Sequence, residues 1–119
     1  MSNPREIAQS FVTYFYQVFD SAPANLAGLY SNDSMLTFEG QEFLGAEQIL
    51  GKINSTGATF VHKPETLDVQ PLFDGSILVV VSGSLTIDTN NPLQYSESFI
   101  LKNNGANSFY VANDVLRLI

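Results

Sequence analysis

The stretch S-I-L-V-V-V-S-G-S-L-T-I, Ser76 to Ile87, is the clearest β-strand signal in the chain. Its odd-numbered positions form one nearly continuous apolar face, because successive side chains of a strand point to opposite sides of a sheet. The even positions Leu78 and Val80 are apolar too, whereas the later even positions are Ser or Thr. We therefore expect one face of this strand in the core and part of the other face covered as well.

Strand periodicity continues on both sides of this segment. Pro64 interrupts the runs Thr59–His62 and Thr66–Val69. Because proline has no N–H for a sheet ladder, these runs predict a strand that bends, begins late or lies at a sheet edge. Two further strands are expected over Tyr95–Lys102 and Phe109–Leu118, joined by a run of Asn, Gly and Ala residues that suits a hairpin turn.

The amino-terminal part of the chain has helical spacing instead. Asn3, Pro4 and Glu6 have the form of a helix start, with Asn3 as the N-cap and Pro4 at the first helical position. An apolar stripe at spacings of one, three and four follows as far as Phe19, as expected of a helix that packs on a core. The sequence Asp20-Ser21-Ala22-Pro23 ends this first helix.

Shorter elements are expected next. A short second helix carries Leu26 and Leu29, and a third helix is expected over Ala46–Ile53. We expect a turn at residues 31–34 and two short strands on either side of Gly40. Helices first and long strands afterwards predict a single α+β domain over residues 1–119, with three helices packed on one face of a curved antiparallel sheet.

The composition limits the partners. There are 12 acidic and five basic residues, a formal net charge of −7, which disfavours nucleic acid and anionic membranes and favours a basic protein surface. Apolar residues make up 45% of the chain and charged residues 14%, against about 25% charged in typical soluble domains, which suggests self-association. No apolar run is long enough to span a membrane and no secretory leader is evident, so an intracellular protein is expected.

Few residues suggest chemistry. The chain has no Cys, no phosphate-binding Gly loop and no G-x-S-x-G elbow, so we expect no metal and no cofactor. The single histidine, His62, is expected to have a structural or partner-contact role. Asp68 and Asp114 lie in alternating strands, where either could point into a cavity and have a raised pKa, although most such residues face water or cap a turn.

Several segments, in order along the chain, resemble the nuclear transport factor 2 family. They are F-V-T-Y-F-Y-Q-V-F-D (11–20), L-A-G-L-Y (26–30), S-M-L-T-F-E (34–39), T-L-D-V-Q-P (66–71), G-S-L-T-I-D (83–88), N-P (91–92), S-F-I-L (98–101) and Y-V-A-N-D-V-L-R-L (110–118). The resemblance implies a cone-shaped α+β roll that forms a homodimer through the outer sheet face. Leu78 and Val80 fit that interface, and the resemblance adds Val115.

The resemblance also implies a function. Family members bind the GDP form of the small GTPase Ran and the Phe-x-Phe-Gly repeats of nucleoporins, and they return Ran to the nucleus. This implies a protein of the cytoplasm and nucleus that visits pore complexes at the nuclear envelope. The family's Ran site is a hydrophobic cavity rimmed by carboxylates. Glu39 and Asp88 match two rim positions, and Phe38 and Phe60 are candidates for the cavity wall.

Two positions depart from the family pattern. A third acidic rim position has no match, because the chain reads Thr89-Asn90-Asn91 after Asp88. The family's amino-terminal aromatic, which binds pore repeats, is also missing, because the corresponding stretch is Asn3-Pro4-Arg5.

An enzyme is the alternative reading. The same fold carries isomerases and dehydratases that place an acid or base and a Tyr in the cavity. Here Tyr14 or Tyr16 with Asp68 or Asp114 could imitate such a site.

Overall fold

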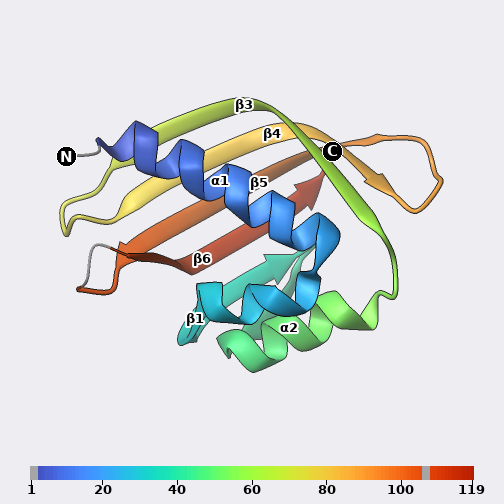
Figure 1. The fold of residues 1–119 in the computed structure, drawn as a ribbon, viewed down its shortest axis with the longest axis horizontal. Helices are drawn as coiled ribbons and strands as arrows, with labels where there is room; N and C mark the ends of the chain where they lie inside the picture. The colour runs from blue at the N-terminus through green and yellow to red at the C-terminus, as the bar shows by residue number, and fades with distance from the viewer. Residues whose placement is uncertain (1–2, 106–107) are drawn as a thin grey trace.

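The computed structural model describes residues 3–105 and 108–119, which fold into helices packed on one curved sheet (Figure 1). The predicted hairpin turn before the last strand includes residues 106 and 107, which lie outside the described part. None of the described helices is long and apolar enough to cross a membrane. The elements in chain order are α1 (Pro4–Ser21), the 3₁₀ helix η1 (Pro23–Leu29), β1 (Tyr30–Phe38), β2 (Gln41–Leu44), α2 (Gly45–Ser55), β3 (Phe60–Pro71), β4 (Ile77–Ile87), β5 (Leu93–Asn103) and β6 (Phe109–Leu118).

The six strands form one sheet in the order β2-β1-β6-β5-β4-β3. Neighbouring strands are antiparallel, as expected, except that β1 runs parallel to β6. These two strands are joined through most of the chain and not by a hairpin, so no tight turn forces them to run in opposite directions. The sheet is therefore mixed.

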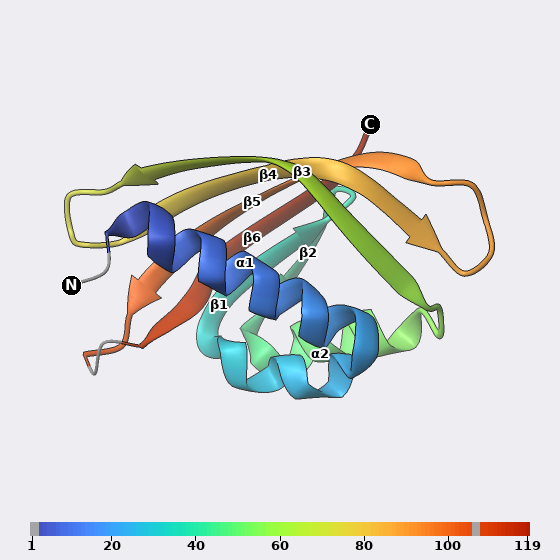
Figure 2. The same ribbon diagram turned by 45° about the horizontal axis from the view of Figure 1, so that its top comes forward.

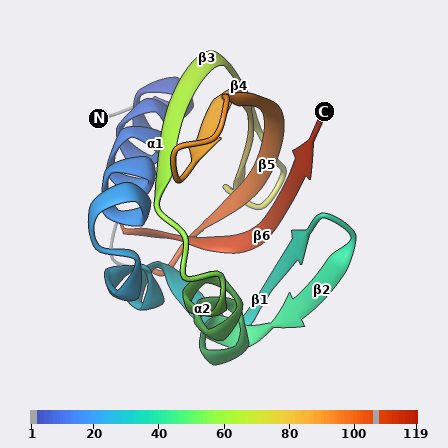
Figure 3. The same cartoon turned by 90° about the vertical axis from the view of Figure 1, so that its right-hand side faces the viewer.

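The sheet curls around α1, which lies in its concave face, while η1 and α2 close the end formed by β1 and β2 (Figures 2 and 3). Asn3 caps α1 as predicted, because its side chain accepts a hydrogen bond from the backbone N–H of Glu6 over 2.8 Å. Phe15 is fully buried at the centre of the core, with its ring 5.0 Å from that of Phe99 on β5. The aromatic face of α1 thus fills the hollow of the sheet.

The predicted alternation of β4 is confirmed. Ile77, Val79, Val81 and Leu85 are buried, whereas the even-numbered residues between them are half-buried on the outer face. The prediction of a turn at residues 31–34 is wrong, because these residues lie within β1 and do not separate it from the preceding helix. The pairing of β1 with β6 is irregular there, since the Ser34 hydroxyl donates to the Val111 carbonyl and accepts from the Ser31 N–H.

Pro64 lies, as predicted, in a bent edge strand. Pro64 pairs with Gly83 and Thr66 with Ser82, so β3 has one extra residue at this point, a β-bulge. Side chains of α1 cover parts of the open edge of β3. Asp20 accepts from the N–H of His62 and Arg5 donates to the carbonyl of Leu67, so these groups are not left for another strand to pair with.

Gly83 makes the bulge possible. A Cβ at this position would lie 2.2 Å from the Lys63 carbonyl oxygen and 2.8 Å from Pro64 Cα. These contacts are with backbone atoms, which cannot rotate away as a flexible side chain could. The close approach of β3 to β4 at this position therefore requires a residue without a side chain.

We expect Gly83→Ala to lower the free energy of unfolding by about 1–3 kcal/mol, because the added methyl forces the two strands apart. Gly51→Ala is the matched control. Gly51 lies inside α2 with no atom within 4 Å of the added Cβ, so this change should raise stability by about 0.5–1 kcal/mol. Urea unfolding followed by circular dichroism measures both values, and equal effects of the two variants would contradict this account of the bulge.

Candidate functional site

A small, partly open cavity lies between the helices and the concave face of the sheet. Its volume is about 10 Å³, which is room for roughly one water molecule. One side of the cavity is apolar and the other carries titratable groups. The lining residues are Phe19, Tyr30, Leu36, Phe38, Ile53, His62, Glu97, Asp114 and Leu116.

Two carboxyl groups, Glu97 on β5 and Asp114 on β6, lie side by side at the polar wall. Both side chains are buried, at 4% and 2% exposed. Tyr16 donates its hydroxyl hydrogen to Glu97 Oε1 and Tyr30 donates to Asp114 Oδ2, each over 2.9 Å. Among the described residues, no N–H or hydroxyl donates to Asp114 Oδ1.

A second bulge directs Asp114 into the cavity. Ile100 pairs with Asn113 but Leu101 pairs with Val111, so Ala112 is an extra residue in β6. An extra residue reverses which side chains face inward. As a result Asp114 is buried beside Glu97, while Asn113 is exposed.

Burial is the main reason that the pKa of Glu97 lies well above its usual range, and the charge of Asp114 raises it further. Burial also raises the pKa of Asp114, but hydrogen bonds with Glu97 and Tyr30 oppose that rise. We therefore assign the shared proton to Glu97, from which it can be donated to the otherwise unpaired Asp114 Oδ1. The pair then carries one negative charge instead of two.

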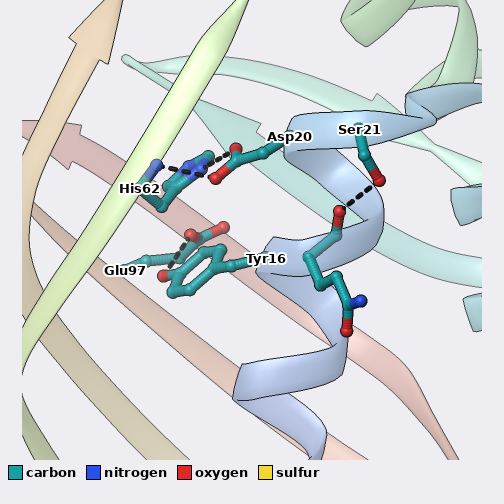
Figure 4. A network of polar contacts seen from close by, with 6 residues as sticks. Tyr16, Asp20, Ser21, His62 and Glu97 are labelled. Carbon is teal, nitrogen blue, oxygen red and sulfur yellow. Dashed lines mark hydrogen bonds and ion pairs between the residues drawn. The ribbon is translucent and has the colours of Figure 1, made fainter.

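His62 belongs to the same polar cluster (Figure 4). Its Nδ1 lies 2.6 Å from Asp20 Oδ1, and its ring stacks on Tyr16 at 4.3 Å between centroids. The buried Tyr95 ring meets both rings edge-on, and burial raises the pKa of Tyr95 to about 12. These contacts hold His62 between α1 and β3, a structural role consistent with the sequence-based expectation.

Glu39 and Asp88 lie on exposed turns at the ends of strands. Both have left-handed backbone conformations, with φ of 51° and 56°. Each carboxylate is held by the backbone, since Glu39 Oε1 accepts from the N–H of Leu118 and Asp88 Oδ1 accepts from that of Thr59. The two side chains are therefore fixed in direction, while the residues remain exposed.

The two predicted wall residues differ in position. Phe38 lines the cavity and is the one lining residue that is not buried. The Lys52 ammonium lies over its ring, 5.3 Å from the centroid. Phe60 is buried and packs edge-on against Phe19, with 5.3 Å between centroids, but it is not among the residues that line the cavity.

The outer face of the sheet has an apolar band across several strands. Leu78 and Val80 are half-buried, and Leu78 pairs with Ile100 on β5. Val115 of β6 and Met35 of β1 extend the band and are both more than a third exposed. Met35 could not be assigned to this face from the sequence, because its exposure there depends on how β1 pairs with β6.

Glu97 was also missed by the sequence analysis. The available signal was its odd-numbered position between Tyr95 and Phe99, which face the core. Of the residues named for an enzyme site, Tyr14 and Asp68 are exposed and point away from any shared site with Asp114. Among the described residues, no group of three or more His, Asp or Glu is placed to hold a metal ion.

A curved α+β roll with a cavity of single-water size, and with exposed carboxylates such as Glu39 and Asp88 held by the backbone, is typical of a binding domain. Comparisons with known proteins agree with this fold and assign the chain to a family. The family model described as "Nuclear transport factor 2 (NTF2) domain" matches residues 7–118. The chain belongs to the nuclear transport factor 2 family, and it is a nuclear transport carrier and not an enzyme.

Similar proteins match over nearly the whole chain. Nuclear transport factor 2 of Emericella nidulans is 46% identical over 100% of this chain and 98% of its own, and that of Saccharomyces cerevisiae is 43% identical over 94% and 91%. The structure of nuclear transport factor 2 from Cryptosporidium parvum superposes with a TM-score of 0.94 at 34% identity, covering 98% of this chain and 94% of that one.

The carboxyl pair predicts a pH-dependent stability. Because its pKa is raised in the folded state, Glu97 keeps a proton that the unfolded chain loses above about pH 4.3. The free energy of unfolding should therefore fall as pH rises from about 5, by up to roughly 1.4 kcal/mol per pH unit, until the pair ionises. Glu97→Gln removes this titration and should show a flatter profile in urea unfolding between pH 5 and 8.

Glu42→Gln is the control for that experiment, because Glu42 is an exposed carboxyl on β2. Its profile should follow that of the wild type. A Glu97→Gln profile parallel to the wild-type curve would contradict the assignment of the proton to Glu97.

Proposed function

We propose that this carrier binds the GDP form of Ran and the Phe-x-Phe-Gly repeats of nucleoporins, and so returns Ran to the nucleus. It would act in the cytoplasm, in the nucleus and at pore complexes in the nuclear envelope. The observation that carries the proposal is the match to nuclear transport factor 2 proteins at 40–47% identity over 94% or more of the chain. The acidic rim is the part of the molecule to which we assign Ran recognition.

Glu39 and Asp88 supply the charge of this rim. A net charge of −7 attracts a basic partner surface, and exposed carboxylates at fixed positions decide where it binds. The backbone hydrogen bonds to both carboxylates limit their freedom before binding, so less side-chain entropy is lost in the complex. This preorganisation supports their assignment as Ran contacts.

A partner side chain would enter the cavity at Phe38, by displacing its ring. The family resemblance implies that this side chain is an aromatic residue of Ran. An aromatic ring is much larger than the cavity volume of about 10 Å³, so the wall has to move for the ring to be inserted. Phe38 is the half-exposed member of the wall, and its contact with Lys52 is a weak one that a partner can replace. Phe60 would support the wall through Phe19.

We assign homodimer formation to the apolar band on the outer sheet face. Leu78, Val80 and Val115 lie on this face, and Met35 continues it onto β1. A contiguous apolar surface of this kind commonly marks a protein interface, because burying it removes apolar area from water. A second copy is the expected partner, since a twofold dimer buries the same face on both subunits.

Reversing the charge of Glu39 should weaken binding of Ran-GDP by at least about 2 kcal/mol, or roughly thirtyfold, because Glu39→Lys places two cations against each other. Asp33→Lys is the control, since it makes the same charge change on an exposed residue of β1 away from the rim. Calorimetric titration measures both affinities after circular dichroism has verified folding. Equal affinities of Glu39→Lys and Asp33→Lys would remove Glu39 from the site.

Val80→Glu should convert a wild-type dimer into monomers, because a carboxylate without a partner would be buried in the interface at a cost of several kcal/mol. Tyr14→Glu adds the same charge at a residue that is 54% exposed on α1, and it should leave the dimer intact. Sedimentation equilibrium at micromolar concentration measures both. A monomeric wild type, or a dimeric Val80→Glu, would rule out this interface.

Pore-repeat binding should be weaker than in relatives with an amino-terminal aromatic, because such an anchor often contributes about 2 kcal/mol or more. Pro4→Trp should restore part of this affinity. It is preferable to a change at Arg5, whose side chain donates to the carbonyl of Leu67. Titration with a Phe-x-Phe-Gly peptide measures the gain, and no gain would show that the missing aromatic is not what limits binding.

A further inference from the structure

We propose that the polar wall of the cavity is a binding site for a primary ammonium group, held between Glu97 and Asp114. The site is the polar wall of the cavity that a partner side chain is proposed to enter at Phe38, but it uses residues other than the exposed Glu39 and Asp88. It can therefore be tested without any partner protein.

The geometry leaves one acceptor that only the Glu97 proton can satisfy among the described residues. Glu97 and Asp114 approach from neighbouring strands at diagonal positions, since Glu97 pairs with Leu116 and Asp114 with Phe99. The Tyr16 and Tyr30 hydroxyls occupy Glu97 Oε1 and Asp114 Oδ2. Asp114 Oδ1 receives no N–H or hydroxyl from the described residues, although it is buried at the cavity wall. When the Glu97 proton leaves, Asp114 Oδ1 becomes a buried acceptor without a donor, which is unfavourable, and the N–H of a bound ammonium group would take the place of that proton.

A cation can replace the proton at this site without changing the total charge. With the proton on Glu97, the pair carries a charge of −1. When an ammonium ion enters and the Glu97 proton leaves to solvent, two carboxylates and one cation again sum to −1. The apolar side of the cavity, formed by Phe19, Leu36 and Ile53, screens charges less than bulk water does, which strengthens the attraction.

The other titratable groups nearby do not supply that cation. His62 from β3 is already paired with Asp20 of α1 over 2.6 Å. Tyr16, Tyr30 and Tyr95 are phenols with raised pKa values and stay uncharged. Among the described residues, the two carboxyls are thus the groups at this wall that can exchange a proton for a cation.

The size of the cavity and its need for a hydrogen-bond donor decide which cation fits. The cavity volume of about 10 Å³ suits a group as small as water, which ammonium is, and excludes guanidinium or quaternary ammonium. Ammonium donates hydrogen bonds in fixed directions, as Asp114 Oδ1 requires. Potassium has a similar size but no N–H donor, so it provides the matched control.

The test is a titration of the isotope-labelled protein with ammonium chloride, followed through the backbone NMR signals of Glu97 and Asp114, against potassium chloride at equal ionic strength. We expect a saturable shift with ammonium alone, with affinity rising between pH 6 and 8 by up to about tenfold per pH unit, because binding releases a proton. Glu97→Gln and Asp114→Asn should each weaken binding at least tenfold. Two variants are used so that the failure of one to fold leaves the other as a test.

A second titration, with the N-acetyl methylamide of lysine, distinguishes the source of the ammonium group. Saturable binding of both ligands would assign the site to a lysine side chain, whereas binding of ammonium alone would assign it to a small free amine. Equal shifts with ammonium and potassium, or unchanged ammonium affinity in the folded variants, would overturn the proposal. Neither result would affect the Ran titration of the Glu39 variants.

Discussion

The close approach of β3 and β4 at Gly83 is the constraint on which the structure depends. Because Gly83 has no side chain between the two strands, the extra residue beside Pro64 fits into β3 and the sheet can bend there. The bend forms the hollow that α1 fills with aromatic side chains around Phe15. A flat sheet would leave Phe15 and its neighbours without partners, and the cavity between helices and sheet would not exist.

The buried carboxyl pair shows how the same core holds polar groups at low cost. Tyr16 and Tyr30 each donate to one carboxyl, and retention of a proton on Glu97 avoids two negative charges in the buried interior. These bonds also join α1 to β5 and β1 to β6, so the network links elements far apart in the sequence. The cavity is therefore both a packing defect and the most polar part of the interior.

The two faces of the sheet serve different purposes in this carrier. The concave face holds the core and the cavity, whereas the convex face carries the apolar band that includes Val80. Glu39 and Asp88 lie at turns, where left-handed backbone conformations and backbone hydrogen bonds fix their carboxylates. The surfaces proposed for different partners can thus coexist on 119 residues, because each uses a separate part of one sheet.

The sequence by itself determined the elements that depend on local periodicity and on neighbouring residues. These include the capped first helix, the alternating strand at Ser76–Ile87 and the edge position of Pro64, and the order of family segments indicated the fold. Only the tertiary structure decided the parallel pairing of β1 with β6 and the inward direction of Asp114. The first depends on contacts between distant segments, and the second on a bulge at Ala112 that reverses the inside and outside of a strand without any local signal. The pairing of Glu97 with Asp114 follows from the second, because the bulge turns Asp114 to the face of β6 that lies beside Glu97 on β5.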